Sequence, residues 1–345
     1  MRRRLCYLLL LLLPLALPGA CTQVKTPETL RLTGQTMGTT WSVSMHPAPD
    51  ATAAAALRQL LQQRLDRLNG LMSTYDPFSE LSRFNDQAST DWFAIAEDTA
   101  QVIELALAIS QLTGGAFDIS VGPLVELWGF GATPRGSTIP SADQISARLA
   151  LVGYEKIGLR RQPAAISKRV PGLRIDLSAV AKGYAVDALA ELLEQQGVND
   201  YLVEIGGELR LAGTRSDGAP WRIAIEKPLE GVREVAASFP LTGTAVATSG
   251  NYRNFYQEDG QRYAHALDPV SGRPVRHQLA SVTVLDQSCA RADALATALL
   301  VLGEDRGREL CEQHDIAAYF IIYEQDALVV YASPAFQRLV ERVSP

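Results

Sequence analysis

Apolar residues recur every three or four positions in four long segments of the chain, a spacing that predicts amphipathic helices with one buried face. Each segment is followed by glycine, which commonly ends a helix. The predicted helices are Ala53–Leu68, which stops at Asn69-Gly70; Glu97–Leu112, which stops at Gly114-Gly115; a helix that opens at Ser178 and stops at Gly197; and Ala290–Leu302, which stops at Gly303.

Alternating apolar and polar residues, and short apolar runs between turn residues, predict the strands. Strands and helices come in mixed order with several hairpins, which predicts an α+β fold with a largely antiparallel sheet and packed helices. No Pro/Ser-rich linker interrupts residues 34–340, which we expect to form a single domain. The predicted strands are Thr36–Met45, Tyr201–Ile205, Glu208–Leu211, Trp221–Glu226, Ser238–Leu241, Leu279–Leu285, Ile316–Tyr323 and Leu328–Ala332.

The segment Leu173–Gly197 has the most informative pattern. We expect its apolar run, Leu173–Leu177, to be a strand that leads directly into a helix capped by Ser178, with Asp176 at the junction. The first turn of a helix presents unpaired N–H groups that can receive a phosphate, and Lys182 lies one turn along it. The same residues also suit a plain helix cap with a solvated lysine.

The N-terminus has the composition of a targeting segment. Three arginines precede the apolar run Leu8–Leu17, and small residues lead to Cys21, so residues 1–20 are predicted to be a signal peptide. Because Pro18-Gly19-Ala20-Cys21 resembles a bacterial lipobox, we expect Cys21 to be lipidated and residues 21–33 to be a polar tether. The protein would then be anchored to a membrane of the bacterial cell envelope and face the periplasm.

Charge and cysteine content narrow the possible partners. Removing residues 1–20, with three arginines and no acidic residue, lowers the net charge from −6 to −9, so nucleic acid is not an expected partner. Cys289 and Cys311 would remain in an oxidising compartment. Their spacing fits no metal motif, and both a disulfide and two buried thiols remain compatible with it.

Two features carry candidate chemistry. Asp293 and Thr297 lie four residues apart in a predicted helix, so both oxygens face one side, an arrangement that suits Mg²⁺ and also an ordinary helix cap. His265 stands beside a turn, where a packed or solvated imidazole is equally compatible. The glycine-rich stretch around Phe117 and Trp128 permits either stacking on a ring system or ordinary core packing.

Eight motifs occur together and in order, and they resemble those of the ApbE family, the FAD:protein FMN transferases of bacterial envelopes. The similarity covers nearly the whole chain after the signal segment. The motifs are Met37-Gly38-Thr39; Ser73-Thr74-Tyr75 with Ser79–Asn85; Gly114–Asp118; Asp176–Ala179 with Lys182-Gly183-Tyr184; Gly206-Gly207; Thr248-Ser249-Gly250; His265 with Asp268-Pro269; and Ala292-Asp293 with Ala296-Thr297.

The resemblance implies a function and a set of site residues. Members of the family bind FAD and Mg²⁺, cleave the pyrophosphate and attach FMN to a threonine of an acceptor flavoprotein. The implied metal ligands are Asp293, Thr297 and the backbone carbonyl of Ala179. The implied FAD contacts are Met37, Tyr75, Ala116, Phe117, Asp118, Asp176, Lys182 and Ala266.

Mechanism and partners follow as expectations. An unperturbed imidazole titrates near pH 6.5, so His265 is the expected base for the acceptor hydroxyl, with Asp176 orienting it or sharing that role, and AMP would leave. By resemblance, the acceptor is an exported FMN-bearing subunit of a quinone oxidoreductase or an Rnf-type complex. The alternatives are an envelope lipoprotein that binds FAD without catalysis and a Mg²⁺-dependent FAD pyrophosphatase.

Overall fold

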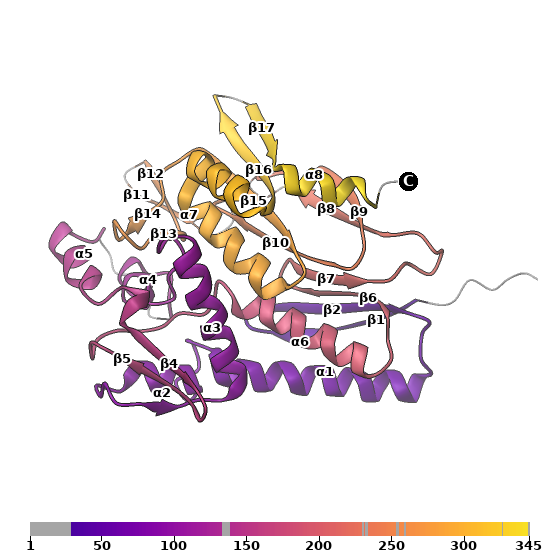
Figure 1. Ribbon diagram of the computed structural model, residues 1–345, viewed down its shortest axis with the longest axis horizontal. Helices are drawn as coiled ribbons and strands as arrows, with labels where there is room; N and C mark the ends of the chain where they lie inside the picture. Colours follow the sequence, from indigo (N-terminus) through magenta and orange to yellow (C-terminus); the bar gives the residue numbers. More distant parts are fainter. Residues whose placement is uncertain are drawn as a thin grey trace, which may run out of the picture.

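Strands from both halves of the chain build one large antiparallel sheet, seen edge-on through the middle of Figure 1. The computed structural model describes residues 29–132, 139–229, 231, 234–252, 255–258, 260–325 and 327–343. Within these residues the sheet has eight strands, and every neighbouring pair is antiparallel, as predicted. In spatial order they are β1 Leu30–Thr36, β2 Thr39–His46, β6 Asp200–Ile205, β7 Glu208–Ala212, β10 Thr244–Gly250, β15 Leu279–Asp286, β16 Ala317–Glu324 and β17 Ala327–Ala332.

The two faces of this sheet carry separate cores, because side chains alternate along each strand. On β10, Ala245 and Ala247 belong to the larger core, whereas Val246 belongs to a smaller one on the opposite face. The larger core is covered by α1 Ala51–Met72, α3 Glu97–Leu112, α6 Ala181–Gln195 and α7 Cys289–His314. The smaller core is covered by β8 Trp221–Glu226, β9 Val235–Leu241 and α8 Pro334–Glu341.

Short elements form a layer beside the helical face (Figure 1). Within this layer the indole of Trp128 donates to the carbonyl of Gly272 at 2.8 Å and connects two segments that are far apart in the sequence. Ser141 and Gln144 form a capping box at the start of the helix Ala142–Leu149. The elements are α2 Glu80–Asp86, α4 Gly122–Trp128, α5 Ala142–Leu149, the 3-10 turn Tyr154–Lys156, the sheet of β3 Phe93–Ala94, β5 Ala164–Lys168 and β4 Ile157–Arg161, and the hairpins β11 Phe255–Glu258 with β12 Gln261–Ala264 and β13 Leu267–Asp268 with β14 Arg273–Pro274.

The N-terminal elements differ from the prediction in three places. The predicted strand Thr36–Met45 contains the turn of a hairpin, because Met37 and Gly38 adopt positive φ between the end of β1 and the start of β2. Since β1 begins at Leu30, the end of the segment predicted to be a tether is folded. Helix α1 passes through Gly70, whose backbone stays helical, and ends at Met72. The predicted signal peptide and residues 21–28 of the predicted tether, Cys21 included, lie outside the described residues.

The segment before α6 also differs. Residues 173–177 form no strand, and their single sheet-like contact is a parallel bridge from Arg174 to Val121. Ser178 does not cap the helix, because the carbonyl of Leu177 accepts the N–H groups of Val180 and Ala181 and forms a turn before α6 starts. Gly197 follows the end of α6 at φ 78°, as predicted.

Helix α7 agrees with the prediction up to Gly303. There the backbone takes φ 78° and interrupts the helix, as predicted, but a second helical half that was not predicted follows and continues to His314. Cys289 and Cys311 are both buried free thiols, which excludes a disulfide between them in this structure. None of the described helices is long and apolar enough to span a membrane.

Gly183 permits an unusually close contact between α6 and α7. A Cβ at this position would overlap the carbonyl of Cys289 and lie 2.8 Å from Cα of Ala290, both backbone groups that cannot rotate away. By contrast, a Cβ at Gly70 of α1 meets nothing within 4 Å. The two helices can therefore cross at this distance only because position 183 has no side chain.

We therefore expect Gly183→Ala to lower the free energy of unfolding by about 1–3 kcal/mol, the usual cost of overpacking, even though alanine favours helices. Gly70→Ala is the matched control and should leave that free energy unchanged or raise it by up to about 1 kcal/mol. Urea unfolding of both variants checks this. Equal free energies of unfolding for the two variants would contradict this expectation and show that α6 and α7 can move apart enough to accommodate a methyl group at no measurable cost.

Candidate functional site

The first turn of α6 contacts α7 through a hydrogen bond from its backbone to a side chain. The N–H of Gly183 donates to Oδ2 of Asp293 at 3.1 Å. In a regular helix this N–H would donate to the carbonyl four residues earlier, which is that of Ala179. Among the described residues no backbone N–H donates to that carbonyl, so Ala179 presents a free acceptor beside the Asp293 carboxylate.

A lysine and two buried carboxylates form the charged centre of this junction. Lys182 Nζ lies 2.8 Å from Oε1 of Glu208 and 3.7 Å from Oδ2 of Asp293. Burial alone would lower the pKa of Lys182, but the two carboxylates raise it above its ordinary value. Burial raises the pKa of Glu208, against the lowering effect of Lys182. Oε2 of Glu208 is buried and has no hydrogen-bond partner.

Thr297 lies one turn after Asp293 on the same side of α7, as the spacing predicts. Its Oγ1 is 3.2 Å from Oγ of Ser249, at the end of β10. The residues that meet here are thus a carboxylate, a hydroxyl pair and the carbonyl of Ala179. All of them offer oxygen ligands.

Asp187 fixes the start of α7 against α6. Its carboxylate accepts the N–H groups of Cys289 and Ala290 at 2.9 and 3.0 Å and the hydroxyl of Ser288 at 2.8 Å. Arg210 on β7 also donates to it at 3.0 Å. A side chain from a neighbouring helix therefore satisfies the N-terminal N–H groups of α7, which would otherwise be unpaired.

Asp176 is half-buried and lies one turn before α6. Its N–H donates to the carbonyl of Ile119 at 2.8 Å, and its carboxylate accepts the N–H of Ser178 at 2.8 Å. Tyr75 is 69% exposed. Its remaining, partial burial and the negative charges of Asp176 and Glu126 raise the pKa of its phenol. A small cavity lies beside Asp176, lined by Thr74, Asn85, Gly122, Glu126, Arg174 and Ile175.

The aromatic rings of the glycine-rich segment are buried in the core. Phe117 and Trp128 are buried, with 2% and 1% exposure, so neither can stack on a flavin, and this possibility was wrong. The carboxylate of Asp118 accepts hydrogen bonds from Ser120 and from the N–H of Tyr154, and its burial raises its pKa. Contacts from residues 116–118 to a ligand would therefore come from the backbone.

His265 is half-buried beside an aromatic cluster. Its ring meets the ring of Phe130 edge-on, with the centroids 6.5 Å apart. The neighbouring Ala266 is buried, and its carbonyl accepts the N–H of Val275 at 3.0 Å. The expected cooperation of His265 with Asp176 stays a prediction.

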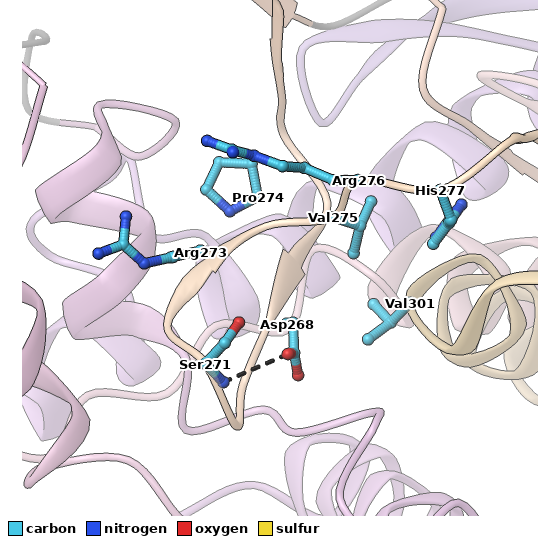
Figure 2. Close-up of a pocket in the computed structure, with 8 residues that line it drawn as sticks. All are labelled: Asp268, Ser271, Arg273, Pro274, Val275, Arg276, His277 and Val301. Atoms are coloured by element: carbon cyan, nitrogen blue, oxygen red, sulfur yellow. Dashed lines mark hydrogen bonds between the residues drawn. The ribbon is translucent and has the colours of Figure 1, made fainter.

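A cavity of about 300 Å³ opens beside the turn that follows His265 (Figure 2). In this turn the carboxylate of Asp268 accepts the N–H of Ser271 at 3.2 Å. No expected flavin or metal ligand lines this cavity, although Asp176 lines the smaller one. The expected metal ligands lie at the α6–α7 junction and not in the larger cavity. The lining residues are Asp268, Ser271, Arg273, Pro274, Val275, Arg276, His277 and Val301.

The sequence analysis missed Glu208 and Asp187. A signal existed for each. Glu208 follows Gly206-Gly207 directly as an acid at the start of a predicted strand, and Asp187 lies seven residues after Val180, on the apolar face of its helix. A buried acid on an apolar face needs a partner, which makes it a candidate for a structural or site role.

The oxygen set at the junction fits Mg²⁺. Among the residues that the structure describes, no three histidine, cysteine, aspartate or glutamate side chains cluster to hold a metal. A cation here would depend on Asp293 together with hydroxyl and carbonyl oxygens, the hard ligands that Mg²⁺ accepts. The free carbonyl of Ala179 and the unpartnered Oε2 of Glu208 leave acceptor capacity for such a cation or for its bound water.

Comparison with known proteins agrees with the motifs. A family model described as the ApbE family matches residues 37–320. The FAD:protein FMN transferase of Vibrio cholerae serotype O1 is 43% identical over 318 residues, which are 92% of this chain and 95% of that protein. The Escherichia coli K12 protein with the same name is 42% identical over 312 residues, 90% of this chain and 89% of that protein.

Solved structures give the same result. Flavin transferase ApbE from Vibrio cholerae has a TM-score of 0.83 at 42% identity, over 90% of this chain and 99% of that one. The apo form of the Pseudomonas stutzeri flavinyl transferase ApbE has a TM-score of 0.83 at 40% identity, over 91% and 97%. The motifs, the family model and these structures agree over nearly the same residues, and the chain therefore belongs to the ApbE family.

Proposed function

We propose that this protein transfers FMN from FAD to a threonine hydroxyl of an acceptor flavoprotein and releases AMP. The observation that carries the proposal is the α6–α7 junction, where Asp293 takes the N–H of Gly183 and leaves the carbonyl of Ala179 available. The relatives that share the fold and more than 40% of the sequence are named FAD:protein FMN transferases. Asp293, Thr297 and His265 favour an enzyme, because a protein that only binds FAD has no need to neutralise its pyrophosphate.

Asp293, Thr297 and the carbonyl of Ala179 are the proposed Mg²⁺ ligands. When bound, Mg²⁺ would neutralise charge on the pyrophosphate of FAD. Lys182 adds a fixed positive charge at the same place, because Glu208 holds its ammonium group at 2.8 Å. A pyrophosphate seated here would meet an ammonium group held in place by Glu208.

The flavin contacts remain proposals that the local structure supports. Tyr75 has an exposed ring beside Asp176, and the backbone of Ala116, Phe117 and Asp118 lies in a stretch shaped by two positive-φ glycines. Met37 and Ala266 complete the proposed set. Met37 stands in the β1–β2 turn at φ 47°, a conformation that residues other than glycine rarely adopt.

His265 is the proposed base for the acceptor hydroxyl. It is half-buried and sits against Phe130, which restricts its ring. Asp176, with its carboxylate directed into the turn before α6, is the alternative base. Either group would remove the proton as the hydroxyl oxygen attacks phosphorus.

The acceptor and the location are also proposals. An exported subunit of a quinone oxidoreductase or an Rnf-type complex would bring the threonine, by resemblance to the family. The apolar N-terminal segment and Cys21 support anchoring to a membrane of the bacterial envelope, facing the periplasm.

The metal proposal predicts the effect of Asp293→Asn, which keeps an oxygen for the N–H of Gly183 and removes the charge. We expect transfer to fall about 100-fold or more, since a metal contributes several kcal/mol to such a step. Heat of Mg²⁺ binding in calorimetry should be lost as well. Asp286→Asn, near the start of α7 but paired with Arg291, is the control. Wild-type Mg²⁺ binding by Asp293→Asn would refute the ligand assignment.

The base proposal predicts that His265→Ala lowers FMN transfer by about 10²–10⁴-fold while FAD affinity stays near that of wild type. Affinity is measured by flavin fluorescence quenching, and transfer by the intact mass of the acceptor. His314→Ala, at the exposed end of α7, is the control. Transfer within about threefold of wild type would favour Asp176 as the base.

The same wild-type assay separates the alternatives. If AMP is released from FAD in the presence of Mg²⁺ while the acceptor gains no FMN, the protein is a pyrophosphatase. If FAD binds but no AMP is released and the acceptor gains no FMN, the protein is a non-catalytic flavin-binding lipoprotein.

The anchoring proposal predicts that Cys21→Ser yields a protein released from membranes with unchanged activity on a soluble acceptor. The mature wild-type protein should begin at Cys21 and carry acyl chains in its intact mass. A mature wild-type mass without acyl chains would replace lipidation with ordinary signal cleavage.

A further inference from the structure

Lys168 is a buried lysine whose role is not explained by the proposed chemistry. It ends strand β5, is 1% exposed, and forms no ion pair among those of the described residues. Its Nζ donates to three backbone carbonyls, those of Phe84, Asn85 and Leu173, at 3.2, 3.2 and 3.3 Å. The ammonium group also lies 5.0 Å from the centre of the Phe84 ring. The three hydrogen-bond donors of this ammonium group are therefore all paired, but only with neutral acceptors.

These carbonyls belong to two segments that meet beside Asp176. Phe84 and Asn85 lie near the end of α2, and Leu173 begins the non-strand run that leads to Asp176. The Asn85 amide pairs with the backbone of Ile175 in both directions, donating to its carbonyl at 2.8 Å and accepting its N–H at 2.7 Å. Asn85 and Lys168 thus hold the backbone at residues 173 and 175 by side chains.

This side-chain support replaces a missing strand partner. Residues 173–177 have one sheet-like bridge, at Arg174, and Asp176 adds one backbone hydrogen bond, to Ile119. The opposite side of the segment depends on Asn85 and Lys168. Asn85 and Ile175 also line the small cavity beside Asp176, so this support reaches the wall of the proposed site.

Burying an ammonium group without a carboxylate is costly, and burial lowers the pKa of Lys168. Structural stability alone gives little reason to retain such a group. A buried cation that bonds three carbonyls nevertheless restricts the backbone more than neutral contacts would, because charge-assisted hydrogen bonds are roughly twice as strong.

We propose that Lys168 and Asn85 are positioning residues that hold Asp176 in the orientation required by the flavin substrate. Neither residue touches the substrate. Both act through the backbone of residues 173–175. The inference rests on the proposed function only in taking Asp176 as a flavin contact.

A double-mutant cycle between Lys168→Met and Asp176→Asn tests this. Methionine keeps most of the unbranched side chain and its packing near Phe84 but lacks the ammonium group with its three N–H donors. We expect Lys168→Met to weaken FAD binding about tenfold in the wild-type background and less than about twofold beside Asp176→Asn, because its effect passes through Asp176. Costs that simply add in the two backgrounds would overturn the proposal.

Lys156→Met is the matched control. Lys156 Nζ also donates to two backbone carbonyls, those of Ala150 and Val152, but it supports the end of α5 and not the segment before Asp176. Its effect on FAD binding should be small and additive with Asp176→Asn. Coupling of Lys156→Met as strong as that of Lys168→Met would also overturn the proposal, since it would reveal a general effect on the fold.

Asn85→Ala keeps the proposal testable if Lys168→Met does not fold. It removes the two bonds to Ile175 and should show the same non-additivity with Asp176→Asn. Circular dichroism establishes that each variant is folded before its affinity is measured. An additive result in a folded Asn85→Ala protein would refute the proposal.

Two readouts separate this inference from the proposed function. FAD affinity does not require an acceptor or turnover, so the cycle can be measured even if FMN transfer fails. If the effects of the mutations on FAD affinity are non-additive but the wild-type protein transfers no FMN, the positioning role is upheld and the transferase is rejected. If those effects are additive and the wild-type protein transfers FMN, the positioning role is rejected and the transferase is upheld.

Discussion

The N–H of Gly183 and the carboxylate of Asp293 make the contact on which the rest of the site depends. The contact exists because Gly183 has no side chain, so α6 can approach the backbone of α7 at Cys289 and Ala290. One hydrogen bond then has two consequences. It orients Asp293, and it deprives the carbonyl of Ala179 of its helical partner. In a regular first turn of α6 that carbonyl would accept a helical N–H group and would be less available as a proposed metal ligand.

Buried charge is concentrated around this contact and is balanced within it. Lys182 lies between Glu208 and Asp293, and Asp187 neutralises Arg210 while it caps α7. Such pairs are weak contributors to stability, because desolvation offsets much of their attraction. Their value here is geometric, since each fixes one helix or strand relative to another. The same reasoning applies to Lys168, which orders a segment that no strand supports.

Much of the fold followed from local pattern. The helix Glu97–Leu112, the first half of α7 and the two strands on either side of Gly206-Gly207 were predicted because their side chains and turn residues act over a few positions. Predictions failed where distant groups replace local ones. The run 173–177 is apolar because it is buried, but Asn85 and Lys168 take the hydrogen bonds that a neighbouring strand would have made. Periodicity cannot reveal a partner about ninety residues away.

The sequence by itself determined the α+β class, the antiparallel character of the sheet and the pairing of Asp293 with Thr297 on one side of a helix, because these depend on spacing. It also carried the ordered motifs that identify the family. Only the tertiary structure decided that Phe117 and Trp128 are core residues, that Cys289 and Cys311 remain thiols, and that Lys182 contacts both Glu208 and Asp293. Burial and contact depend on which segments pack together, and that choice is made by the whole chain.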